Sequence, residues 1–152
     1  MYPALLSIHS IVRWLVLLSL VYAIYRAARG YFSHRPFARA DNAARHWTAT
    51  FAHIQLLVGM LLYTQSPVVK YFWNNTKAAL QQRDITFFGA LHLPLMMTAI
   101  VLLTIGSAMA KRKKEDREKF RTMLLWFTLA LSLILVAIPW PFSPLAGRPY
   151  IR

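Results

Sequence analysis

The chain has 152 residues, 57% of them hydrophobic, and its mean hydropathy of +0.40 is too high for an ordinary soluble domain, so the surplus apolar surface is expected to face lipid. It contains no cysteine, which excludes disulfides, thiolate metal sites, iron–sulfur clusters and covalently attached c-type haem. The formal net charge of +13 does not indicate a nucleic-acid-binding protein, because the basic residues cluster beside the ends of apolar segments, as they do at membrane flanks.

Four long apolar segments predict an all-α membrane protein organised as a single domain over residues 1–152. The first ends at Arg29 and Gly30, which suit the end of a helix, and the second closes before Pro67. The fourth is stopped by Pro139. At about 1.5 Å per residue, each segment is roughly long enough to cross a ~30 Å hydrocarbon core. We therefore expect an up-down bundle of four transmembrane helices, with spans at about residues 4–28, 46–65, 85–110 and 120–138.

The connections between these segments differ in charge. Residues 31–45 are expected to form a loop that contains three arginines and one acid, Asp41. Residues 111–121 form a second basic cluster. The connection at residues 68–84 has fewer basic residues, and part of it is expected to lie flat as a short amphipathic helix. The positive-inside rule places the two basic loops in the cytoplasm beside anionic lipids, and both termini on the outer, periplasmic side of a bacterial inner membrane.

The candidate site begins with His9 and Arg13, one helical turn apart in the first segment, where the flanking residues are hydrocarbon. Both groups are costly in a bilayer and need a partner there. His92, roughly 10 Å into the third segment from the same side, shares the depth of His9, whereas His53 in the second segment lies near the midplane. The first and third helices of such a bundle are diagonally opposite, so His9 and His92 would face each other across it.

Two imidazoles at one depth match the ligands of a bis-histidine haem. We therefore expect one haem b, with His9 and His92 as axial ligands, Arg13 paired with a propionate, and His53 as a reserve ligand. We also expect no buried acid: all five acids lie at or beyond the predicted span ends, which leaves no residues for hydrolytic acid–base chemistry inside the membrane.

Each residue of this site also has a structural interpretation. His9 could bond a main-chain carbonyl, and Arg13 could snorkel towards the interface or bond helix carbonyls. The stripe from His46 to His53 would suit a second cofactor or a proton path, or simply bonds to a neighbouring helix. Three histidines could instead bind zinc or copper, although the depth of His53 and the charge of Arg13 argue against such a site.

The four segments also carry distinctive motifs, namely His9-Ser10-x-x-Arg13-Trp14, His53-Ile54-Gln55-Leu56-Leu57-Val58-Gly59, Leu95-Met96-Met97 and Ile138-Pro139-Trp140-Pro141-Phe142. With these motifs the chain resembles, over most of its length, a group of small bacterial four-span membrane proteins labelled cytochrome b-like. That group has an acid-His-Pro sequence before Leu-Met-Met, whereas this chain has His92-Leu93-Pro94, which puts the imidazole one position earlier. The resemblance implies haem b and electron transfer beside a quinone or a respiratory partner.

Two alternatives remain open. The chain could be a cofactor-free accessory subunit that packs against a larger membrane complex. It could also be a haem-dependent membrane oxidoreductase that acts on a small substrate or quinone, because it is loosely similar to the four-span haem-dependent protoporphyrinogen oxidases, which also place a histidine in the first span.

Overall fold

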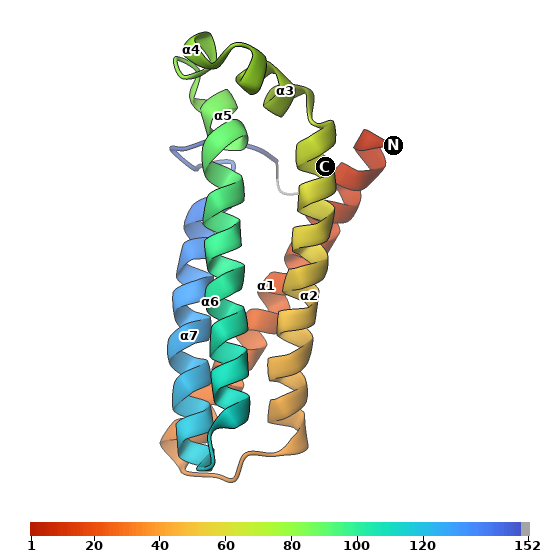
Figure 1. Cartoon of the computed structure of the whole chain (residues 1–152). Coiled ribbons are helices and arrows are strands. Elements are labelled where there is room, and N and C mark those ends of the chain that lie inside the picture. The colour runs from red at the N-terminus through yellow and green to blue at the C-terminus, as the bar shows by residue number, and fades with distance from the viewer. Residues whose placement is uncertain (150–152) are drawn as a thin grey trace.

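The computed structural model describes residues 1–149, and within that range the chain is helical, without a strand. The elements are α1 (Tyr2–Ser33), α2 (Arg39–Gln65), α3 (Pro67–Asn74), α4 (Thr76–Ala79), α5 (Arg83–Thr86), the π-helical turn η1 (Phe87–Leu91), α6 (His92–Arg112) and α7 (Asp116–Ala137). Four long helices, α1, α2, α6 and α7, run alternately in opposite directions, and the short helices α3, α4 and α5 lie at one end of the bundle they form (Figure 1). The predicted all-α architecture is confirmed, and two of the short helices fall in the connection expected to contain one.

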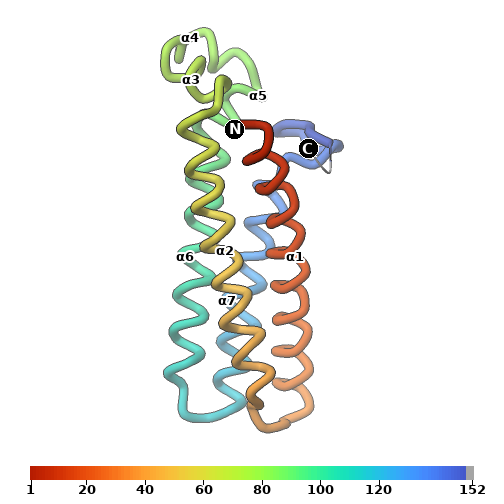
Figure 2. The backbone as a smooth tube through the Cα atoms, turned by 90° about the vertical axis from the view of Figure 1, so that its right-hand side faces the viewer, coloured from red at the N-terminus to blue at the C-terminus, as the bar shows by residue number. Residues whose placement is uncertain are grey.

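The contacts between the long helices show which of them are neighbours and which are diagonal. Helix α1 contacts α2 and α7, and α6 contacts the same two helices, so α1 and α6 are diagonal partners. The N-terminus and the segment after α7 lie at the end of the bundle that carries α3, α4 and α5 (Figure 2). A core of fully buried side chains fills the rest of the bundle, including Leu20, Leu103, Phe120, Met123 and Phe127.

Three helical stretches are long and apolar enough to cross a membrane by length and composition, namely α1, residues Arg83–Arg112 and α7. Helix α2 is not among them, because polar side chains, including two histidines and Gln55, interrupt its apolar sequence. Large apolar side chains such as Leu18, Val101 and Val136 are exposed on the outer faces of the three apolar stretches. The helical membrane-protein character predicted from composition is therefore supported by the structure.

The connection between α1 and α2 is shorter than predicted. Helix α1 continues through Gly30 to Ser33, and α2 begins at Arg39, so the expected loop of residues 31–45 shrinks to residues 34–38. His34 ends α1 in the left-handed conformation, with a φ of 52°. The prediction that Gly30 ends the helix was wrong: a Cβ there would overlap the Phe120 ring, so this glycine lets α1 and α7 approach closely.

The expectation that no acid is buried was also wrong. The Asp41 side chain is 0% exposed near the start of α2, at the basic end of the bundle. Arg35 donates to both of its carboxylate oxygens at 2.7 Å, Arg26 Nε donates to Oδ1 at 2.7 Å, and the Ala38 N–H donates to Oδ2 at 2.9 Å. Burial raises the pKa of Asp41, but these hydrogen bonds outweigh it and lower that pKa to about 2. Hydropathy alone marked this residue as part of a solvated loop.

Arg45 shows the same error in a basic residue. It was expected at the end of the loop, but it lies within α2 and is 6% exposed. Its Nη1 donates to the Ser107 hydroxyl at 2.6 Å and to the Ser107 main-chain carbonyl at 3.1 Å. The guanidinium therefore joins α2 to α6 at the basic end of the bundle.

The helical turn before His92 is widened. The His92 N–H bonds to the Phe87 carbonyl, five residues earlier, instead of the carbonyl four residues earlier. Pro94 accounts for this, because it has no N–H and its ring presses on the carbonyl four residues before it, at Ala90. The Tyr63 hydroxyl of α2 donates to the Gly89 carbonyl at 2.7 Å and so ties the turn to the bundle. Turns of this kind often occur at functional sites, and this one lies directly before His92.

Replacing Tyr63 with Phe should lower the free energy of unfolding by about 1 kcal/mol, because the Gly89 carbonyl and the Trp73 indole N–H would both lose their bond to the hydroxyl. Thermal unfolding in detergent, followed by far-UV circular dichroism, should shift down by roughly 2–4 °C. Tyr71→Phe, which alters an exposed ring on α3, is the matched control and should unfold like the wild type. Equal midpoints for all three proteins would contradict this role for Tyr63.

Candidate functional site

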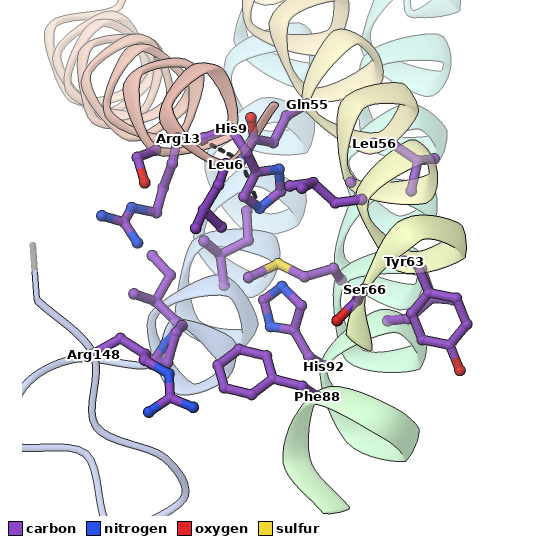
Figure 3. A pocket seen from close by; sticks show the side chains of 18 of the residues that line it. Leu6, His9, Arg13, Gln55, Leu56, Tyr63, Ser66, Phe88, His92 and Arg148 are labelled. Carbon is purple, nitrogen blue, oxygen red and sulfur yellow. Dashed lines mark hydrogen bonds between the residues drawn. The ribbon is translucent and has the colours of Figure 1, made fainter. Parts of the chain in front are cut away.

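A cavity opens between the long helices near the end that carries α3 and the segment after α7 (Figure 3). Its volume is about 180 Å³, more than ten times the roughly 10–15 Å³ that one water needs. Its walls are mainly apolar, and no Asp or Glu among the residues described lines it. The apolar wall includes Leu6, Val16, Leu56, Leu62, Met96 and Ile134.

His9 of α1 and His92 of α6 both line this cavity. Their ring centres are 6.5 Å apart and their planes make an angle of 69°. One metal ion bound to a nitrogen of each imidazole, at about 2 Å from each, would separate the ring centres by roughly 6 Å. The expected juxtaposition of these two histidines is present, at a spacing that suits a single metal between them.

His92 is held firmly in place. Its Nδ1 lies 2.9 Å from the main-chain carbonyl of Ala137 in α7, and its ring is 5.5 Å from that of Phe87 and 6.1 Å from that of Phe88. The carbonyl can only accept, so Nδ1 carries the proton and Nε2 keeps its lone pair. A metal-binding histidine is typically oriented by such a bond, although the bond would equally satisfy a purely structural histidine.

His9 has less complete bonding. Its Nε2 lies 3.3 Å from Nε2 of Gln55 in α2, which also donates to the His9 main-chain carbonyl at 3.0 Å (Figure 3). Nδ1 of His9 and Oε1 of Gln55 are buried and have no hydrogen-bond partner among the residues described. A Cβ at Gly59 would lie 3.2 Å from His9 Cε1, so the glycine makes room for the ring. A buried ring nitrogen without a partner calls for a ligand or a water.

The hydrogen bonding of His9 Nδ1 and that of Gln55 Oε1 depend on each other. If His9 binds a metal through Nδ1, its proton must be on Nε2, which then needs an acceptor. A half-turn of the Gln55 amide would bring Oε1 to that proton, in exchange for the bond to the His9 carbonyl. Gln55 thus sets which nitrogen of His9 is available.

Arg13 of α1 also lines the cavity, as predicted from its place one turn from His9, and its guanidinium lies 5.7 Å from the centre of the Trp14 ring. A second arginine, Arg148, reaches the same cavity from the segment after α7. The two guanidinium groups point to the same side of the cavity, away from Tyr63 (Figure 3). Two cations on one side of an apolar cavity suit a ligand with anionic groups at one edge.

His53, the expected reserve ligand, does not line the cavity. It is exposed on the outer surface of α2, where its Nε2 lies 3.1 Å from the Thr104 hydroxyl of α6. Over residues 1–149, no group of three or more histidine or acidic side chains is arranged to hold a metal ion. These residues therefore contain no cluster that would support the alternative of a three-histidine zinc or copper site.

Four residues at the cavity were missed as site residues, namely Gln55, Phe88, Met96 and Arg148. Gln55 and Met96 lie in the motifs that carry the resemblance, and all four motifs contribute lining residues to this one cavity. Gln55 and Met96 could therefore have been predicted as site residues from their positions in these motifs. Arg148 had no such signal, because it lies in a proline-rich segment without periodicity.

Comparison with known proteins adds no assignment: no family model matches the chain, and neither a curated protein nor a solved structure is significantly similar to it. Function is therefore argued from the site.

Proposed function

We propose that this protein is a four-span membrane protein of the bacterial inner membrane that binds one haem b between His9 and His92 and transfers electrons. The observation that carries the proposal is the histidine pair, with ring centres 6.5 Å apart in an apolar cavity. The buried Nδ1 of His9, which has no hydrogen-bond partner among the residues described, is a second indication of a ligand. Apolar walls and two guanidinium groups at one side fit a flat, largely apolar ring with acidic substituents.

The membrane arrangement follows from α2 and from the basic residues. Residues 46–65 of α2 contain no Asp, Glu, Lys or Arg, and Ile54, Leu57 and Leu61 are exposed there, as a lipid-facing surface requires. This supports α2 as the fourth span. Basic residues gather where α1 meets α2 and where α6 meets α7, so the positive-inside rule places those turns in the cytoplasm, beside anionic lipids. The cavity, the N-terminus and the segment after α7 are then on the outer side.

In this proposal the chain binds, orients and insulates the cofactor. Haem b, when bound, supplies one-electron transfer at its iron. His92, fixed by Ala137, and His9, adjusted by Gln55, would hold the iron through their ring nitrogens. Arg13 would pair with a propionate, and the apolar wall would keep water away from the cofactor. The position of the cavity near the outer membrane face suits exchange of electrons with a quinone or a respiratory membrane complex.

An absorption spectrum of the detergent-purified protein, oxidised and then reduced with dithionite, tests this function. We expect a red protein whose reduced form has a sharp α-band, with haem b identified by its pyridine haemochrome and about one haem per chain. A protein that is colourless as purified and gives no shift of the Soret band when titrated with haemin would overturn the proposal.

A second candidate, the cofactor-free accessory subunit, is favoured by a specific observation. His92 already bonds the Ala137 carbonyl, and His9 already contacts Gln55, so both imidazoles join helices without any ligand. The spectrum decides between the two functions. If haem is present, repeated catalytic turnover of a small substrate or quinone analogue would identify a haem-dependent oxidoreductase instead of an electron carrier.

A further inference from the structure

The segment after α7 brings a second cation to the cavity. Arg148 is 135 residues away from Arg13 in sequence, yet both line the same cavity and their guanidinium groups lie on the same side of it (Figure 3). No carboxylate of the described residues lines the cavity beside them. A cavity with cations and no lining acid favours an anionic ligand.

The present bonds of Arg148 leave part of its guanidinium unused. Nη1 lies 2.8 Å from Oδ2 of Asp84, and this pair is partly exposed, with side-chain exposures of 25% and 46%. The guanidinium also lies 5.0 Å from the centre of the Phe88 ring, which itself contacts His92. Nε of Arg148 is buried and has no hydrogen-bond partner among the residues described. A partly exposed ion pair contributes little, so Arg148 can exchange Asp84 for a ligand at low cost.

We propose that Arg13 and Arg148 form a two-carboxylate site, in which each guanidinium binds one carboxylate of the ligand and Arg148 leaves Asp84 to do so. This inference rests on the proposed function, which identifies the two carboxylates as the propionates of haem b. The segment that carries Arg148, residues 138–149, then closes the cavity over the bound ligand, and Asp84 competes with the ligand for the same arginine.

The test titrates the purified, haem-free full-length protein in detergent with haemin and with haemin dimethyl ester, and follows the Soret band. The ester lacks both carboxylates but keeps the ring and the iron. The wild type should bind haemin about 10- to 100-fold more tightly than the ester. Arg148→Gln should weaken haemin binding about 10-fold and leave binding of the ester unchanged, because the lost contact is with a carboxylate.

Asp84→Asn is expected to change haemin affinity in the opposite direction to Arg148→Gln. It therefore distinguishes carboxylate binding by Arg148 from a purely structural role of the Arg148–Asp84 pair. Removing the competing carboxylate should tighten haemin binding, whereas a merely structural ion pair would make Asp84→Asn and Arg148→Gln weaken it alike. Arg83→Gln, which alters an exposed arginine next to Asp84, is the matched control and should bind haemin like the wild type.

The outcomes distinguish the two proposals. If neither haemin nor its ester gives a low-spin spectrum, the proposed function fails. If both bind and the wild type does not discriminate between them, or if Arg148→Gln binds haemin like the wild type, haem binding stands and the two-carboxylate site is overturned.

Discussion

The His92→Ala protein should lose the sharp reduced α-band of the wild type, and its affinity for haemin should fall by more than the roughly 10- to 100-fold that changes around a metal ligand cost. His92 is the better fixed of the two imidazoles, since the Ala137 carbonyl and two phenylalanine rings hold it in place. Its loss leaves a gap at the cavity wall and one axial position empty. Titration with haemin, followed at the Soret and α-bands, measures the effect.

His9→Ala should have the same spectral consequence, because the two rings face one site from diagonal helices. Free imidazole can enter the gap in either variant, so adding it at millimolar concentration should restore much of the low-spin spectrum. Far-UV circular dichroism checks that each variant stays helical. This rescue would not occur if the histidines served only to join helices.

His53→Ala is the control that the structure supplies. His53 is exposed and its ring contacts Thr104 instead of the cavity, so the spectrum should be unchanged. Loss of the α-band in His53→Ala, together with its retention in His92→Ala, would refute the assigned ligand pair. It would return His53 to the axial role that its sequence position also allowed.

His53 also shows where sequence reasoning reaches its limit. Counting residues from the ends of apolar segments gives the depth of a side chain. By this count His9 and His92 lie at one level, and in the structure their ring centres are 6.5 Å apart. Depth does not determine which face of the helix turns inward. That depends on how α2 packs against α1 and α6, and this packing turns His53 out and Gln55 towards His9.

The helix ends show a second limit. Hydropathy placed residues 39–45, the start of α2, in a loop because they are rich in charge. The sequence does not reveal that Arg35 and Arg26 would enclose Asp41. The widened turn before His92 could in principle have been predicted, because Pro94 removes a helix donor, whereas the Tyr63–Gly89 bond that ties this turn to α2 could not. Elements follow from composition and periodicity, whereas long-range polar pairs follow from packing.

The buried ion cluster at Asp41 leads to the second large effect. Asp41→Asn keeps the shape of the side chain but removes its charge, so the guanidinium groups of Arg26 and Arg35 lose the carboxylate that both of them bind. Breaking a buried pair typically costs about 3–5 kcal/mol, and the partial exposure of both arginines reduces this to about 2–3 kcal/mol. Thermal unfolding in detergent at pH 7 should shift down by roughly 5–10 °C. Asp116→Asn, which alters a partly exposed acid paired with Lys119 at the start of α7, should change little.

The same carboxylate makes stability depend on pH in a defined direction. The pKa of Asp41 is about 2 in the folded chain, compared with 3.8 for an unperturbed aspartate. The folded state therefore holds this proton less tightly than the unfolded state. The resulting stabilisation, about 2 kcal/mol, is present above about pH 4 and is lost as the pH falls towards 2. The wild type should therefore lose its advantage over Asp41→Asn in that window, and the two midpoints should converge. A constant difference between them from pH 5 down to pH 2 would show that Asp41 stabilises the bundle by shape and not by charge.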